Sequence, residues 1–352
     1  MPRSLDLDLP RCGRHPSARV TRSGTYGSRE RPLYRCGPRR ASDQHAFSPP
    51  SSEVRRQYRY SNAEIAHALW FLGRGVSFFE AGAETRHRTG RPESKDSYLT
   101  VPWLERFAPA IIATMTPRPS ALGNVLLDAQ PFNVVALYPD GTPKPGGELR
   151  FTVLGAAAQK RTGAPMTVLA LRAYWDKGSS SWRDFLRHVP GDAQRIICDG
   201  GQAIRQPARV RWPSARLTTS AWHLLHRCDE ILTKNELDSR KGTLYPALRQ
   251  SLTSKAAWER FVRLARAQKI ADLEKWILEV EAVIQPQIAR HERPTSTGAL
   301  ETALRSVKKH LAEQRGSYRN LDRLNLLLGL DVLRLNGLDN ERAYARSIAA
   351  AK

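Results

Sequence analysis

The sequence predicts an α/β domain in the second half of the chain, and the order of its apolar segments carries this prediction. Predominantly apolar segments at 124–138, 149–158 and 166–175 are typical of strands. Residues 179–189 have helical spacing, and the apolar run at 193–200 indicates a further strand. Three strands, a helix and a fourth strand are the pattern of an α/β domain.

The charge of the chain indicates a polyanionic partner. Lys and Arg number 56 against 34 Asp and Glu, so the net charge is +22 and the isoelectric point is near 10.4. The excess extends through both halves of the sequence, and Arg dominates its front. Arginine suits bidentate contacts to phosphate and guanine, so nucleic acid is the leading candidate. The alternative is a basic surface that binds nothing.

No segment of the sequence has the character of a membrane span or a secretion signal. No apolar run approaches the ~20 residues that cross a bilayer, and the N-terminal residues 1–10 lack an apolar signal core. Four cysteines are too few for a disulfide scaffold in a chain of 352 residues. We therefore expect a cytoplasmic protein, associated with the nucleoid if it binds DNA, and no membrane partner.

Residues 10–48 contain two pairs of possible metal ligands, Cys12 with His15 and Cys36 with His45. Two Cys and two His suit tetrahedral zinc, and a glycine-containing hairpin between the pairs would bring the second pair back to the first. A short segment rich in Arg, Pro and Ser cannot build a sizeable core, so bound Zn²⁺ would supply folding energy. The alternative is a chance occurrence, because the gap before His45 is wider than the usual finger spacing.

Residues 58–92 predict two short helices. Ser61 with Glu64 and Ser77 with Glu80 each have the spacing of a capping box, and glycines separate the two segments. Two short helices joined in this way beside an Arg cluster favour a helix-turn-helix that binds DNA. An ordinary helical hairpin is the alternative.

The cations expected to contact DNA from this region are Arg86, Arg88 and Arg91, which lie at the end of the second helix and just after it. Residues 95–120 predict a connecting helix, which would serve either as an interface or as part of a core.

Two aspartates have unusual positions in the predicted strands. Asp128 lies inside the first strand between apolar residues, and Asp199 closes the fourth. A carboxylate in an apolar strand is costly unless it is paired or bound to a metal, so the two would form a site for a hard cation if their strands were adjacent. The alternative for each is an acid that caps the following turn.

Glu301 begins a late helix, and Arg305 and Lys308 follow it on the same helical face. This face could hold a metal ion and DNA together, or Glu301 could simply pair with Arg305. Between Asp199 and Glu301, residues 226–294 predict a helical subdomain in which Trp258 and Trp276 are expected to be core residues rather than contacts for flipped bases.

The order of these motifs resembles that of bacterial insertion-sequence transposases of the Asp-Asp-Glu type, and more narrowly of those related to the Mutator-like group. The resemblance implies a ribonuclease H-like catalytic core, here residues 121–225 and 295–345, interrupted by the all-helical insertion. The predicted zinc knuckle and helix-turn-helix are similar to the N-terminal arrangement of some of these enzymes.

Carried over residue by residue, the resemblance implies a metal-binding catalytic triad of Asp128, Asp199 and Glu301 that holds two Mg²⁺ or Mn²⁺ ions. Related enzymes often have Cys-x-x-His after the second Asp. This sequence has Ser220 and His223 at those places, so His223 is expected in a supporting role and the role of Ser220 is open.

The function implied is a DNA transposase that binds the ends of its element and catalyses metal-dependent strand cleavage and strand transfer into target DNA. Such enzymes usually act as dimers or larger assemblies, so a homo-oligomer on double-stranded DNA is expected. Two alternatives stay open: a non-catalytic DNA-binding regulator derived from a transposase, and a ribonuclease H-like metal-dependent nuclease.

Overall fold

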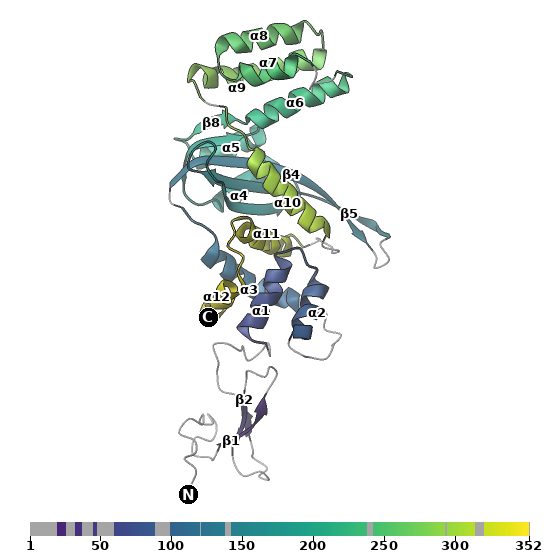
Figure 1. The fold of residues 1–352 in the computed structure, drawn as a ribbon, viewed down its shortest axis with the longest axis vertical. Coiled ribbons are helices and arrows are strands. Elements are labelled where there is room, and N and C mark those ends of the chain that lie inside the picture. Colours follow the sequence, from purple (N-terminus) through teal and green to yellow (C-terminus); the bar gives the residue numbers. More distant parts are fainter. Residues whose placement is uncertain are drawn as a thin grey trace. The chain divides into compact units, whose positions relative to one another are not determined.

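The computed structural model of the chain forms two compact units, one comprising Met1–Thr114 with Asp339–Lys352 and the other Met115–Leu338 (Figure 1). The residues that the structure describes are 20–25, 32–36, 45–47, 60–88, 99–119, 121–137, 142–237, 242–292, 294–313 and 320–351. No helix among these described segments is long and apolar enough to cross a membrane.

The first unit contains a small antiparallel sheet of three strands, β1 (Val20–Thr25), β2 (Pro32–Cys36) and β3 (His45–Phe47). The pairing of β1 with β2 confirms the expected hairpin. In the register of β2 with β3, Cys36 lies directly opposite His45. Two of the four proposed zinc ligands are therefore backbone neighbours, whereas Cys12 and His15 lie outside the described residues.

The helices of the first unit are α1 (Asn62–Leu72), α2 (Phe78–Arg88), α3 (Thr100–Met115) and α12 (Glu341–Ala350). Both predicted capping boxes are present. The hydroxyl of Ser61 accepts from the backbone N–H of Glu64 at 3.1 Å, and Ser77 accepts from that of Glu80 at 3.2 Å. Each carboxylate accepts a hydrogen bond from its serine's backbone N–H in return, so the caps fix where α1 and α2 begin.

Packing in this unit buries the whole middle of α1, residues 65–69, and the largest apolar side chains of α3. Ile65 and Leu69 of α1 are fully buried, and Tyr60 packs edge-on against Trp103 of α3 with ring centroids 4.7 Å apart. α12 packs along α1. The predicted connecting helix thus exists and contributes Trp103 and Phe107 to a core.

The second unit has a mixed α/β fold around a five-stranded sheet. Its strands are β4 (Ala121–Leu137), β5 (Pro143–Gln159), β6 (Thr167–Tyr174), β7 (Asp192–Cys198) and β8 (Arg216–Thr219). The order across the sheet is β6-β5-β4-β7-β8, with β4, β5 and β6 antiparallel and β7 and β8 parallel to β4. The four predicted strands are all present, and β8 is an additional strand that the sequence analysis did not predict.

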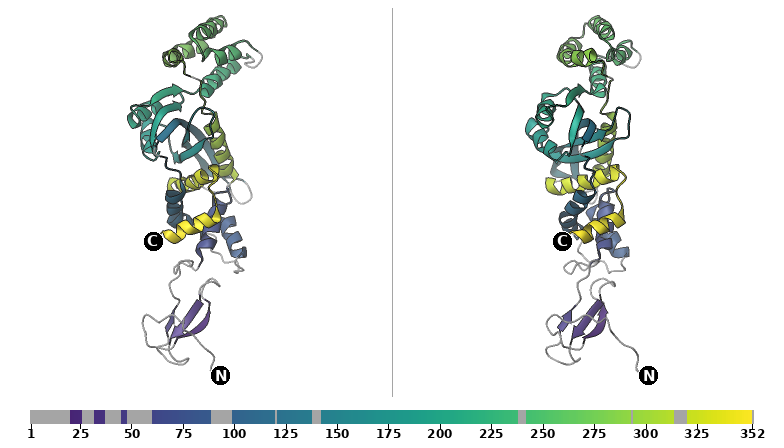
Figure 2. Two further views of the ribbon diagram at one scale, coloured as in Figure 1. Left: turned by 60° about the vertical axis from the view of Figure 1, so that its left-hand side comes forward. Right: turned by 90° about the vertical axis from the view of Figure 1, so that its left-hand side faces the viewer.

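Helices cover both faces of this sheet, as the two views in Figure 2 show. One face packs on α4 (Ser179–Arg187) and α5 (Gln202–Arg211), with Trp182, Phe185 and Ile204 in the shared core. The opposite face carries α10 (Gly298–Glu313), which contacts β4 and β5, and α11 (Leu321–Leu335), which contacts β6. Both faces of the central strand β4 are therefore buried.

The described residues between β8 and α10 form four helices: α6 (Ala221–Lys234), α7 (Leu244–Ser251), α8 (Lys255–Arg266) and α9 (Ala271–Ala289). They share a separate apolar core. Trp258 is fully buried in it and Trp276 is 6% exposed, which agrees with the expected core role of both residues. The expected helical subdomain is present, and α6 begins slightly before its predicted start at residue 226.

Candidate active site

Parallel pairing of β4 with β7 brings Asp128 and Asp199 to the same level of the sheet. Leu126 is the register partner of Ile197, and each aspartate lies two residues further along its strand direction. Side chains two residues apart in a strand point to the same face. Both carboxylates therefore lie on the face covered by α10, and Asp199 follows directly after the end of β7.

Asp128 is a buried acid whose hydrogen-bonding capacity is only partly used. Its side chain is 4% exposed, and Oδ1 accepts from the backbone N–H of Ala129 at 2.8 Å. Oδ2 is buried without a hydrogen-bond partner. A buried carboxylate oxygen without a donor is destabilising unless a ligand supplies the missing contact.

Asp199 is less buried, and Oδ1 accepts from the backbone N–H of Gly201 at 2.9 Å at the start of α5. The turn-capping role considered for this residue is therefore present. It occupies one of the two carboxylate oxygens, which leaves Oδ2 for another ligand.

Glu301 reaches the same region because α10 packs closely on the sheet (Figure 1). In the register of β4 with β5, Asp128 lies opposite Gly155. A Cβ atom at Gly155 would come within 3.3 Å of Leu300 Cδ1 and 3.4 Å of Leu304 Cδ2. The missing side chain thus allows the first turn of α10, with Glu301, to lie against the strand that carries Asp128.

His223 joins the three acids from the first turn of α6. Its Nε2 lies 3.4 Å from Asp128 Oδ1, which is within the distance of an ion pair. The geometry of this contact is not that of a hydrogen bond, so Nε2 has no hydrogen-bond partner. Burial acts to lower the pKa of His223, but the adjacent Asp128 carboxylate outweighs this effect, and the pKa is raised above its ordinary value. The charges of Asp199 and Glu301 act in the same direction. All three predicted acids therefore act electrostatically on His223.

Of the two cations predicted on the face of Glu301, Arg305 lies beside it and Lys308 lies two turns further along α10. Arg305 Nε is 3.4 Å from Glu301 Oε1, so the simple helix ion pair considered for Glu301 is present. The Arg305 side chain is nevertheless 63% exposed, whereas that of Glu301 is 11% exposed. Lys308 is also exposed, and its Nζ donates to the carbonyl oxygen of Pro131 at 3.4 Å. Both cations are thus exposed to solvent on α10, and Arg305 is the one in contact with an acid of the site.

The donor chemistry of the cluster fits a hard divalent cation. Asp128, Asp199 and Glu301 offer carboxylate oxygens, the ligands that Mg²⁺ and Mn²⁺ prefer, and Asp128 Oδ2 lacks a partner. Within the segments that the structure describes, no group of three or more His, Cys, Asp or Glu side chains is placed so that it could hold a metal ion. Mg²⁺ usually keeps several waters and takes only one or two carboxylates, so it does not require a closed cage.

The predicted DNA contacts of the first unit differ in exposure. Arg86 is buried, so its guanidinium is withdrawn from the surface of α2. Arg88 is 57% exposed and donates to His67 Nδ1 at 2.6 Å and to Glu341 Oε2 at 3.4 Å. Arg91 lies outside the described residues. Of the three arginines, Arg88 is the one that the described surface presents to a ligand.

Arg205 is a residue of this region that sequence reasoning missed. It lies on α5, it is 9% exposed, and its Nη1 is 3.4 Å from Thr219 Oγ1. Burial lowers the pKa of Arg205, and the charge of Asp199 acts in the opposite direction. A buried guanidinium thus lies within electrostatic range of Asp199. The sequence gives no sign that Arg205 is buried, because α5 contains several arginines and the burial of this one depends on β8.

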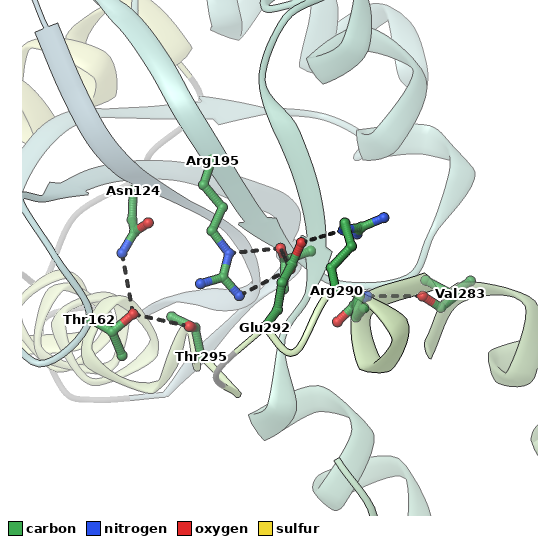
Figure 3. A network of polar contacts seen from close by, with 9 residues as sticks. Asn124, Thr162, Arg195, Val283, Arg290, Glu292 and Thr295 are labelled. Carbon is green, nitrogen blue, oxygen red and sulfur yellow. Dashed lines mark hydrogen bonds and ion pairs between the residues drawn. The ribbon is translucent and has the colours of Figure 1, made fainter. Parts of the chain in front are cut away.

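The segment that leads back from the helical layer to α10 is attached to the sheet by polar contacts (Figure 3). Glu292 Oε2 accepts from Thr218 of β8 at 2.8 Å and lies 3.4 Å from a guanidinium nitrogen of Arg195 in β7, while Oε1 accepts from Arg290 at 2.7 Å. Further along, Thr295 is hydrogen bonded with Thr162 at 3.2 Å. These contacts fix the path of the chain into the helix that carries Glu301.

The chain matches no model of a known protein family, and no curated protein sequence matches it significantly.

Proposed function

We propose that this protein is a DNA transposase of the Asp-Asp-Glu type, with Asp128, Asp199 and Glu301 as its metal-binding catalytic residues. The observation that carries the proposal is the convergence of these acids, from β4, from the end of β7 and from α10, around His223. Asp128 and Asp199, about 70 positions apart in the sequence, lie at one level of neighbouring strands, and Glu301, about 100 positions further on, lies in the helix that covers this face. Carboxylates near one another repel, so this arrangement does not serve the stability of the fold.

The sheet supports a ribonuclease H-like core. Such a core has three antiparallel strands continued by two parallel ones, and the order β6-β5-β4-β7-β8 has this arrangement. The helical layer α6–α9 lies in sequence between the second and third acids, where the resemblance expects an insertion. Fold alone does not define an activity, so the argument for function depends on the acids.

In the proposed mechanism Asp128, Asp199 and Glu301 would hold two divalent ions, which supply charge neutralisation and a more acidic water or hydroxyl at phosphorus. Asp128 offers its buried Oδ2, and His223 beside Oδ1 restrains the orientation of the carboxylate. Arg305 and Lys308 are exposed to solvent on α10 and would bind the DNA backbone on either side of the reacting phosphodiester.

The proposed reaction has two in-line displacements at phosphorus. Water first attacks the phosphodiester at the element end, and the bond to the 3′ oxygen breaks, which releases a 3′-hydroxyl. That hydroxyl then attacks a phosphodiester of the target strand, forming a new P–O bond as the target's own 3′ oxygen leaves. Positioning and charge neutralisation supply most of the acceleration in such transfers.

Recognition of the element ends is assigned to the first unit. A capped helix pair with the exposed Arg88 supports a DNA-binding role for α1 and α2. The register of Cys36 opposite His45 supports a zinc site completed by Cys12 and His15. A homo-oligomer acting on paired element ends completes the proposal.

The test is a strand-cleavage assay with purified protein, Mn²⁺ and DNA fragments that carry the sequences flanking the gene. We expect a specific nick with wild-type protein and none with Asp128→Ala, Asp199→Ala or Glu301→Gln, while DNA affinity is retained. Full cleavage by any of the three variants would remove that acid from the mechanism. Binding without cleavage by the wild type would favour the non-catalytic regulator.

A further inference from the structure

Ser220 lies at the point where three parts of the proposed active site meet. It follows the last residue of β8, it is the N-cap residue of α6, and it is fully buried. β8 runs beside β7, which leads into Asp199, and α6 carries His223 in its first turn. A buried hydroxyl at this junction needs a partner.

The backbone of Ser220 connects β7 with α6. Its N–H donates to the carbonyl oxygen of Cys198 at 2.8 Å, the residue directly before Asp199. Its carbonyl oxygen accepts from the backbone N–H of Leu224 at 3.2 Å, which closes the turn of α6 that contains His223. The backbone hydrogen bonds of Ser220 therefore hold the first turn of α6, which contains His223, against the end of β7, which Asp199 follows.

The side chain of Ser220 connects the same junction to α10. Its Oγ accepts from the backbone N–H of Thr297 at 3.1 Å and is 3.1 Å from Thr297 Oγ1. Thr297 is also fully buried, and its carbonyl oxygen accepts from the backbone N–H of Glu301 at 3.0 Å. One further hydrogen bond thus joins the Ser220 hydroxyl to the residue that carries the third carboxylate.

The ordinary use of a serine at this place would be to cap its own helix. A serine at an N-cap normally accepts from a backbone N–H in the next turn. The Ser220 hydroxyl makes no such bond to α6 and instead reaches a residue 77 positions away. Its side chain is therefore committed to the N-terminus of α10 rather than to the helix that it begins.

We propose that Ser220 is a positioning residue that sets the distance of Glu301 from Asp128 and Asp199 through Thr297. This inference rests on the proposed function, since it assumes that the three acids bind metal ions together. It also gives a role to the residue that stands where the related enzymes have Cys. Partners that orient metal ligands typically change metal affinity by about 10–100-fold when they are removed.

The test is Mn²⁺ binding to the full-length protein without DNA, measured by titration calorimetry. We expect Ser220→Ala to weaken Mn²⁺ binding by about 10–100-fold. Ser220→Thr keeps the hydroxyl and is expected to restore much of the affinity. The matched control is Ser251→Ala, because Ser251 is equally buried and its hydroxyl donates to Leu248 O at 2.6 Å within α7, so its removal should leave Mn²⁺ binding unchanged.

A second variant covers the case in which Ser220→Ala does not fold. Thr297→Val is nearly isosteric, removes the hydroxyl from the other end of the contact and should also weaken Mn²⁺ binding. Wild-type Mn²⁺ affinity in both Ser220→Ala and Thr297→Val, alongside lost binding in Asp128→Asn, would overturn the role of Ser220 and leave the proposed function standing. Unchanged binding in Asp128→Asn would instead overturn the proposed function, and the inference with it.

Discussion

Substitution of Asp128 by Asn is predicted to stabilise the metal-free protein. Asp128 is 4% exposed, its Oδ2 has no partner, and it shares its surroundings with Asp199 and Glu301. An unsatisfied buried polar group costs about 1–3 kcal/mol, and more if it is charged. Removing the charge should therefore raise the free energy of unfolding by about 1–3 kcal/mol. For a unit of this size this corresponds to an increase in Tm of about 2–4 °C per kcal/mol.

Asp331 provides a matched control, because it is as buried as Asp128 and also lies beside a histidine, but it has an arginine partner in addition. Its Oδ1 accepts from Arg334 at 2.9 and 2.7 Å and lies 3.4 Å from His310 Nδ1. Breaking a buried ion pair by removing one partner typically costs about 3–5 kcal/mol. Asp331→Asn should therefore lower Tm, whereas Asp128→Asn should raise it.

The assay is thermal unfolding of the full-length wild type and both variants in EDTA and in excess Mn²⁺. A ligand that binds only the native state raises its stability, so Mn²⁺ should raise the Tm of the wild type and of Asp331→Asn but not that of Asp128→Asn. A fall in Tm for Asp128→Asn in EDTA, comparable with that of Asp331→Asn, would refute the reasoning. Asp128 would then be a structural ion-pair partner of His223.

Three further predictions concern the close packing of α10, the attachment of the return segment and the exposed cations. Gly155→Val should displace α10, lower the free energy of unfolding by about 1–3 kcal/mol through overpacking and reduce Mn²⁺-dependent cleavage. Urea unfolding and cleavage rates equal to those of the wild type would contradict this prediction. Burial raises the pKa of Glu292, but its hydrogen bonds and the charge of Arg195 outweigh this, and the pKa is lowered. The ionised Glu292 therefore stabilises the fold above its unfolded pKa near 4.3, and this stabilisation is lost as pH falls through its folded pKa. Wild type and Glu292→Gln should differ in urea stability at pH 7 and converge at low pH. An equal difference at both pH values would count against this role of Glu292. If Arg305 and Lys308 each contact one phosphate, the double variant Arg305→Ala and Lys308→Ala should reduce the slope of log K for DNA binding against log salt concentration by about 1.8. An unchanged slope would exclude both contacts.

Local patterns in the sequence were sufficient to predict most elements of the fold. Apolar segments predict β4 to β7, and the capping boxes predict where α1 and α2 begin. β8 was missed because it has only four residues, Arg216–Thr219, and its strand conformation depends on pairing with β7. Local propensity carries little information about so short an edge strand.

The candidate site could be named from the sequence but not assembled from it. That Asp128 and Asp199 are level with each other follows from the register of Leu126 with Ile197, which is a property of the folded sheet. The burial of Arg205 and the bond from Ser220 to α10 likewise depend on elements far apart in the sequence. Sequence alone leaves the role of Ser220 open, and only the tertiary structure shows where its hydroxyl is used.

The measurement that tests the central claim most directly is the joining of a pre-cut element end to plasmid DNA in Mn²⁺. Two substrates should be compared, identical except that one ends in a 3′-hydroxyl and the other in a 3′-deoxy sugar. The account predicts joined product from the 3′-hydroxyl substrate alone, and none from either substrate with Asp128→Ala, Asp199→Ala or Glu301→Gln. Plasmid nicking without joining from either end would contradict strand transfer and identify the protein as a nuclease.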